Sequence, residues 1–246
     1  MRPEAPLHAR NRLATAYLGA VGAAGAAILG LSLLGVARAG LGGWGFPAWA
    51  ALALLTVATG RLSVRLTLPS CIVSVSDAFV VLTVLLLGAG PATVVGALDG
   101  FAASVRSRGG WQKRAFNAAG MAISVGIAAR LFARVTPAAG LWGSPGRLLA
   151  GVLLLAAVQY LVNTVLVSGA AALRDHVSPL QLLRGSFLFA GTCGLAGSLA
   201  AALVFLAMQR LGPATSLALL PVPLALHLLY RAALRRPETV SAPSRG

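Results

Sequence analysis

The sequence predicts an all-α integral membrane protein, a polytopic bundle of about eight helices. Three observations favour this class. The 246 residues are 58% hydrophobic and only 10% charged, and the mean hydropathy is +0.85, which is too apolar for a soluble domain. Long apolar runs recur along the chain, and turns rich in glycine and proline separate them. Basic residues gather between these runs, as they do in the loops of membrane proteins.

The chain divides into one membrane domain and two short tails. We expect a cytoplasmic N-terminal tail at residues 1–12, the membrane domain at residues 13–236, and a disordered cytoplasmic tail at residues 237–246. The first apolar run, residues 13–36, is followed at residues 37–39 by a small-x-small sequence similar to a signal-peptide cleavage site. Because that run is too long for the apolar part of a signal peptide, we expect an uncleaved first helix.

Turn and capping residues predict where the helices begin and end. Ser144 and Pro145 start one helix by a cap and a proline at the first helical position. Ser178 and Gln181 form a capping box for the next. We expect eight helices. The fourth runs from the turn at Pro91 to near Arg106, and the others cover residues 13–36, 46–60, 75–87, 114–135, 144–173, 178–211 and 213–236.

The stretch before the third helix does not look like a membrane helix. Residues 61–76 first alternate polar with apolar side chains, a period of two that predicts extended backbone lying flat. Ser74 and Asp77 then form a capping box at the start of the third helix. After the fourth helix, the basic segment 106–114 contains a diglycine that should end that helix.

A short helical hairpin is predicted at residues 75–106. The sequence Gly88-Ala89-Gly90-Pro91 turns the chain between its two helices. Residues 75–87 give a helix of about 20 Å at ~1.5 Å per residue, whereas a hydrocarbon core is about 30 Å thick. Full spanning and re-entrant arrangements are both compatible with the sequence, and both return the chain to the same side. A helix that begins earlier, near Cys71, would be long enough to span.

The net charge of +15 is distributed as topology signals and not as a nucleic-acid surface. With the N-terminus inside, fifteen of the 20 cations face the cytoplasm and five face outward. We therefore expect a multi-pass protein of the inner (plasma) membrane with both termini cytoplasmic, in contact with anionic lipids. No nucleic-acid partner is expected. The outward cations are Arg38, Arg130, Arg134, Arg147 and Arg210.

The inventory of reactive residues does not favour catalysis. Cys71 and Cys193 lack the spacing of metal ligands, so we expect no metal and no cofactor. Asp99-Gly100, Ala103 and Arg106 are similar to the core motif of CDP-alcohol phosphotransferases, which needs three further aspartates to hold metal. We therefore expect no enzymatic activity. The positions of those aspartates are occupied here by Gly96, Asn117 and Met121.

A few polar residues inside apolar runs are candidates for ligand binding. A carboxylate such as Asp99 costs roughly 2.5 to 3.5 kcal/mol in a membrane core, so it must be paired or face water. A structural ion pair with Arg106 and a contact with an ion or ligand both satisfy that need. Asn117, Asn163 and His227 fall in the cytoplasmic half of three helices, where each could simply bond a neighbouring helix. Together they favour one shared polar pocket.

The order of features over residues 68–174 resembles a known membrane region. LPSCIVSVSDAFVVLTVLLLGAGPATVVGALDGFAAS, the basic loop, RAFNAAGMAISVGIAARLF and YLVNTVLVSGAAAL are similar to the multi-pass domain ahead of bacterial cyclic-di-GMP signalling modules (HD-GYP or GGDEF). The resemblance implies a sensory or regulatory membrane domain. The matching positions are Pro69, Ser74, Asp77, Gly90, Pro91, Phe116, Asn117 and Asn163.

Two functions follow as expectations. The first is a bacterial inner-membrane sensor that binds a small or lipid-like ligand. Because only PETVSAPSRG follows Arg236, where the family carries an output domain, such a sensor would act through a partner protein. The alternative is a transport component, either a substrate-binding subunit resembling those of energy-coupling-factor importers or a lipid or solute carrier. A short broken hairpin and small-residue helix faces fit both functions.

Overall fold

The computed structural model describes residues 7–60, 64–65, 72–73, 76–136, 144–175 and 179–212. Over these residues the chain forms seven helices and one pair of very short strands. The predicted eighth helix and the C-terminal tail lie outside the described residues. The elements are α1 (Leu7–Ala39), α2 (Gly45–Thr59), β1 (Val64–Arg65), β2 (Ile72–Val73), α3 (Ser76–Leu87), α4 (Ala89–Arg106), α5 (Trp111–Val135), α7 (Pro145–Asp175) and α8 (Pro179–Leu211).

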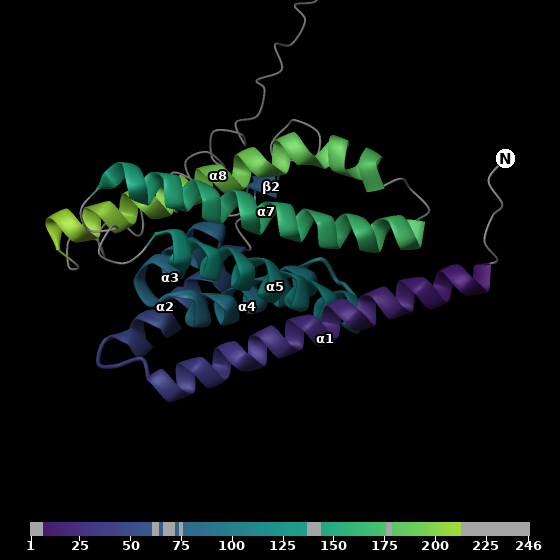
Figure 1. The fold of residues 1–246 in the computed structure, drawn as a ribbon, viewed down its shortest axis with the longest axis horizontal. Coiled ribbons are helices and arrows are strands. Elements are labelled where there is room, and N and C mark those ends of the chain that lie inside the picture. Colours follow the sequence, from purple (N-terminus) through teal and green to yellow (C-terminus); the bar gives the residue numbers. More distant parts are fainter. Residues whose placement is uncertain are drawn as a thin grey trace, which may run out of the picture.

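The helices form a bundle with its short helices inside. In Figure 1, α7 and α8 run side by side along one edge, α1 runs along the opposite edge, and α2 to α5 fill the space between them. Helix α5 contacts α1, α4 and α7, and α3 contacts α2, α4 and α8. The described residues of α3 are the most enclosed, because Val80, Val81 and Thr83 are completely buried. Helix α3 is apolar on all sides, and a helix of this kind is stable when neighbouring helices surround it.

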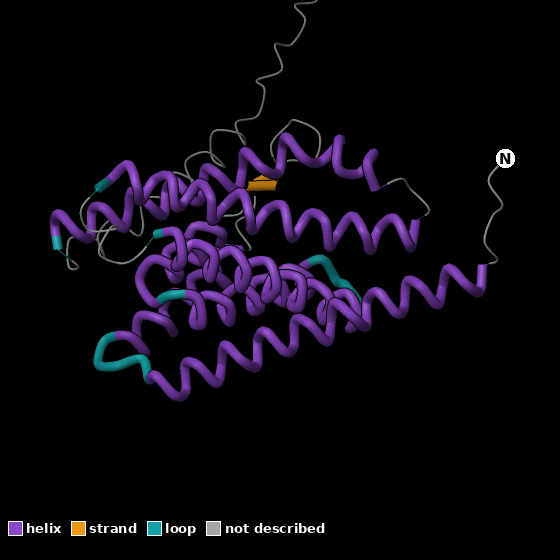
Figure 2. The backbone as a smooth tube through the Cα atoms, viewed as in Figure 1, coloured by secondary structure: helices purple, strands orange, loops and turns teal. Residues whose placement is uncertain are grey.

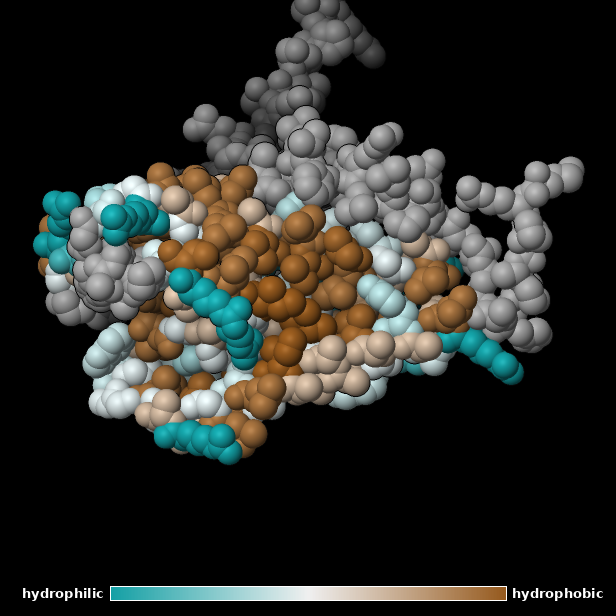
Figure 3. Space-filling model, in the orientation of Figure 1, coloured by the Kyte–Doolittle hydropathy of each residue, from teal (hydrophilic) through white to brown (hydrophobic). Residues whose placement is uncertain are grey.

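Four of the described helices are long and apolar enough to cross a membrane. Large apolar side chains on these helices and on α2 point outward, among them Leu31, Leu54 and Leu203, each about two-thirds exposed or more. Figure 3 shows apolar side chains gathered over the middle of one face, with the most hydrophilic residues mainly toward its ends. This distribution suits a lipid-facing surface. The candidate spans are Arg12–Ala39, Trp111–Val135, Pro145–Arg174 and Gly194–Leu211.

Glycine and proline set the helix ends where the sequence predicts them. Gly88 alone separates α3 from α4 and has φ 85°, a conformation that favours glycine. Helix α7 begins at Pro145, and the Ser144 hydroxyl accepts a 3.5 Å hydrogen bond from the Arg147 amide. Residues 107–110 separate α4 from α5 at the predicted diglycine (Figure 2). These helix ends are confirmed.

The two predicted capping boxes fall at the edges of the described residues. Helix α3 begins at Ser76, which places Asp77 in its first turn, and Ser74 lies outside the described residues. Helix α8 begins at Pro179 with Gln181 in its first turn, although the structure does not describe that side chain. Ser178 also lies outside the described residues. Both caps therefore stay predictions, whereas the helix starts agree to within a residue.

The segment before α3 is extended where it is described. Strands β1 and β2 pair antiparallel, with Val64 opposite Val73 and Arg65 opposite Ile72. This agrees with the extended backbone predicted from the period-two pattern. The alternative in which α3 begins near Cys71 is wrong, because Ile72 and Val73 belong to a strand.

Helix α3 is therefore short, and α1 and α2 contact the residues just after its turn into α4. Its 12 residues span about 18 Å at ~1.5 Å per residue. A Cβ at Gly90 would lie 3.4 Å from Val36 Cγ2 and 3.5 Å from the Ser32 carbonyl oxygen, both on α1. The Trp49 indole on α2 donates a 3.1 Å hydrogen bond to the Pro91 carbonyl. The turn residue itself is half-buried, and a Cβ at Gly88 would meet none of the described residues within 4 Å.

Close helix packing depends on only some of the glycines. A Cβ at Gly25 of α1 would collide with Ala119 of α5. Gly96 and Gly100 of α4, one turn apart, similarly bring α4 against α5. The other glycines of α1 do not share this role among the described residues. A Cβ would meet nothing within 4 Å at Gly19, Gly22 and Gly30.

Candidate functional site

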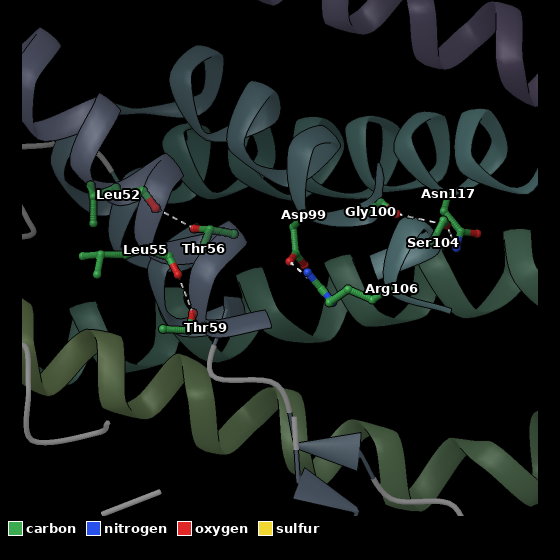
Figure 4. Close-up of polar contacts among 9 residues, drawn as sticks. All are labelled: Leu52, Leu55, Thr56, Thr59, Asp99, Gly100, Ser104, Arg106 and Asn117. Carbon is green, nitrogen blue, oxygen red and sulfur yellow. Dashed lines mark hydrogen bonds and ion pairs between the residues drawn. The ribbon is translucent and has the colours of Figure 1, made fainter. Parts of the chain in front are cut away.

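Asp99 is a buried carboxylate near the middle of the bundle. It lies on α4 with 7% of its surface exposed, and the Ser76 side chain at the start of α3 hydrogen-bonds it. Its Oδ1 atom lies 4.0 Å from Arg106 Nη2, two turns further along α4 (Figure 4). That separation is an ion pair but is too long for a hydrogen bond. Oδ1 is buried and has no hydrogen-bond partner among the described residues.

The Arg106 guanidinium interacts both with Asp99 and with the end of α2. Its guanidinium lies against Gly60, where α2 ends, and a Cβ at Gly60 would come within 2.7 Å of Cζ and Nη1. The carbonyl end of a helix carries a partial negative charge, which attracts the guanidinium as Asp99 does. The absence of a side chain at Gly60 is what lets Arg106 reach both. The predicted ion pair between Asp99 and Arg106 is thus present, in a long and shared form.

A second carboxylate lies close to the first. Asp77, half-buried in the first turn of α3, is near enough to Asp99 for the two charges to repel each other. The side chains described around this point therefore supply two carboxyl groups and one guanidinium. The N-terminus of α3 and the C-terminus of α2 add partial charges of opposite sign, which offset each other. The side chains of Arg61 and Arg65 are not described.

A pocket opens beside Asp99, between α4, α5 and α7. It encloses about 180 Å³, which is smaller than the roughly 300 to 1,000 Å³ of sites for drug-sized ligands. Its polar groups come from three helices, and small side chains at Gly100, Ala103 and Gly120 leave the space. Among the described residues, no three His, Cys, Asp or Glu side chains gather as metal ligands. The lining residues are Asp99, Gly100, Ala103, Phe116, Asn117, Gly120, Met121, Asn163 and Val167.

The two asparagines of the pocket differ in how they are held. Asn117 on α5 donates a 2.6 Å hydrogen bond from Nδ2 to the Ser104 hydroxyl on α4. Ser104 is completely buried and in turn donates to the Gly100 carbonyl at 3.2 Å (Figure 4). Asn163 on α7 faces Gly120, where a Cβ would lie 3.8 Å from its Oδ1 atom. With its nitrogen bonded to Ser104, Asn117 leaves its carbonyl oxygen as the group that can accept a further bond.

Three of the four residues singled out from the sequence therefore line one pocket. Asp99, Asn117 and Asn163 come together from three helices, while His227 lies outside the described residues. Sequence reasoning missed Ser104 and Gly60. Ser104 gave a usable signal, because a serine in an apolar helix one turn after Gly100 can bond back to the helix or across it. Gly60 gave none, since its contact with Arg106 depends on the crossing of α2 and α4.

No protein-family model, curated protein or solved structure matches the chain. The functional inference therefore rests on the chemistry of the pocket and on the bundle that surrounds it.

Proposed function

We propose that this chain is a sensory or regulatory domain of a bacterial inner membrane, which binds a small or lipid-like ligand inside its helical bundle and acts through a partner protein. The proposal includes no catalytic step, because the pocket offers one carboxylate and two amides without a nucleophile beside a base. We further propose that both termini are cytoplasmic and that the basic segment between α4 and α5 contacts anionic lipid headgroups.

One observation carries this proposal. Asp99 is buried, lines the pocket, and has one oxygen without a hydrogen bond among the described residues. Buried polar groups in folded proteins are nearly always bonded, and an unsatisfied one costs about 1 to 3 kcal/mol. A charged group inside a membrane protein is costlier still and usually marks a functional site. A bound ligand would supply the missing bond.

A transport component is the second candidate, and the hairpin of α3 and α4 favours it. Short broken helices that place their ends inside a bundle recur at the binding sites of transporters. Helix α3 spans about 18 Å, and α1 and α2 contact the residues just after its turn, Gly90 and Pro91. We propose that this hairpin is re-entrant. A sensor and a carrier would then share the same pocket and differ in whether the ligand crosses the bilayer.

Molecules that co-purify with the protein test the ligand-binding proposal. Wild type would be extracted in native-lipid particles together with Asn163→Leu, which removes a pocket amide at similar volume. Ser198→Ala is the matched control, because Ser198 is buried on α8, lies outside the pocket lining, and donates a hydrogen bond to the Gly194 carbonyl of its own helix. Mass spectrometry of the extracts should find a molecule in wild type and Ser198→Ala that is depleted in Asn163→Leu.

Identical extracts from wild type and Asn163→Leu would contradict a ligand in this pocket. Once the molecule is identified, uptake into protein-containing vesicles separates the two candidates. Accumulation inside the vesicles above that of protein-free vesicles favours a carrier. Saturable binding without accumulation favours a sensor.

A further inference from the structure

We propose that the pocket between α4, α5 and α7 takes a small organic cation with N–H donors, such as the ammonium end of an alkylamine. This inference rests on the proposed ligand-binding function and names its ligand class. It follows from three properties of the pocket wall: the groups that face it accept hydrogen bonds, the nearby charge is negative, and the space suits a small apolar tail.

The polar groups of the pocket include three hydrogen-bond acceptors, beside the amide N–H groups of its two asparagines. Asp99 lines the pocket, and its buried Oδ1 atom has no hydrogen bond among the described residues. Asn117 uses its nitrogen to bond Ser104, so its oxygen is the remaining acceptor. Asn163 places its Oδ1 atom toward Gly120 in the pocket wall. An ammonium group has three donors and no acceptor, which matches this set.

The charge near the pocket favours a cation. Asp99 and Asp77 lie close together, and Arg106 is the one described cation that pairs with Asp99. Its 4.0 Å contact and its position against Gly60 leave it shared with the end of α2. An added positive charge beside Asp99 would therefore reduce repulsion between the two carboxyl groups. An anion would add to that repulsion.

The rest of the wall suits a short apolar tail. Phe116, Met121 and Val167 line the pocket with apolar surface, and an aromatic face also attracts cations. A water molecule needs roughly 10 to 15 Å³ of comparable space, so about 180 Å³ is more room than a bare metal ion fills. A small alkylammonium ion uses both the acceptors and the apolar wall.

Four probes test whether the ligand is a small organic cation: n-butylammonium chloride, n-butanol, sodium butyrate and potassium chloride. Each is added at a similar concentration to purified protein in sodium chloride at constant ionic strength. Thermal unfolding would be followed for each. Butylammonium should raise the unfolding temperature in a saturable way, because a ligand that binds the folded state stabilises it. Butanol, butyrate and potassium should not.

Two variants locate the effect. Asp99→Asn keeps the shape and removes the charge, so it should weaken butylammonium binding at least about tenfold, the value of a charge-assisted hydrogen bond. Gly120→Ala adds a methyl group to the pocket wall without a clash, which keeps the test open if Asp99→Asn does not fold. It should also weaken binding, whereas Ser198→Ala should not.

An equal shift with butanol, butyrate or potassium would overturn the cation inference, as would no shift with butylammonium. A shift that persists unchanged in the foldable pocket variants would also overturn it. None of these results removes the ligand-binding proposal, which the co-purified molecule decides separately.

Discussion

Replacing Gly100 with alanine should loosen the contact between α4 and α5. The new Cβ would lie 2.8 Å from Met121 Cγ and 2.9 Å from the Asn117 carbonyl carbon, and nearer still to the Asn117 carbonyl oxygen. Ordinary contacts begin at about 3.4 Å. Because two of these atoms belong to the backbone of α5, the helices themselves must move apart. Overpacking of this kind costs about 1 to 3 kcal/mol.

Gly120→Ala is the matched control for this prediction. Its Cβ would meet only Asn163 Oδ1, at an ordinary 3.8 Å. Both substitutions gain the same preference of alanine over glycine in a helix, about 1 kcal/mol. Their difference therefore isolates the packing cost, and Gly100→Ala should be the less stable variant by about 1 to 3 kcal/mol.

The free energy of unfolding can be measured by SDS titration in mixed micelles, followed by circular dichroism. Equal stability of the two alanine variants would refute the close approach of α4 and α5 at Gly100. Gly96→Ala gives a further check, because its Cβ would lie 2.7 Å from Val125 Cγ2, the end of a side chain and not backbone. The free energy of unfolding of Gly96→Ala should therefore lie between those of Gly100→Ala and Gly120→Ala.

Three other predictions concern topology, the hairpin and the Asn117 bond. Reporter fusions at Gly246 and Gly140 should give cytoplasmic and periplasmic signals respectively, and matching signals would contradict the arginine-based orientation. A cysteine at Ala89, in a chain whose own cysteines are replaced, should react with small thiol reagents but slowly with a bulky impermeant one, because the adjacent residues Gly90 and Pro91 contact α1 and α2. Fast labelling by the bulky reagent would indicate a plain spanning hairpin. Ser104→Ala should lower the free energy of unfolding by roughly 1 to 3 kcal/mol, since it leaves the Asn117 amide without its bond, and an SDS midpoint equal to that of wild type would speak against this role.

The helices were largely predictable because their ends depend on local chemistry. Gly88 is needed at its positive φ, and Ser144 and Pro145 start a helix through their own backbone and hydroxyl. Helix α4 ends at Arg106, three residues before the first glycine of the diglycine, and Arg108 has the positive φ in that turn. Apolar length and composition then gave the membrane class. The structure confirms an all-helical bundle with four helices able to span, while the number of eight helices and the re-entrant hairpin stay predictions.

The candidate site was predictable only as a set of residues. Asp99, Asn117 and Asn163 stood out because polar groups are costly in apolar helices, and the two asparagines were at a similar predicted depth. Their meeting in one pocket required the rotation of three helices about their own axes. The link from Arg106 to Gly60 likewise required α2 and α4 to cross at that point.

Sequence alone thus determined which of the described segments are helical and, within a few residues, most of their ends, since these follow from neighbours along the chain. The starts of α1 and α5 lie six and three residues before the predicted ones. Tertiary structure decided which helix faces meet. In water an apolar stripe reveals the buried face, but in a membrane lipid is as apolar as a neighbouring helix, so that signal is lost. Gly25 packs against α5, while a Cβ at Gly19, Gly22 or Gly30 of the same helix would meet none of the described residues within 4 Å, and only the fit of one helix surface to another made that distinction.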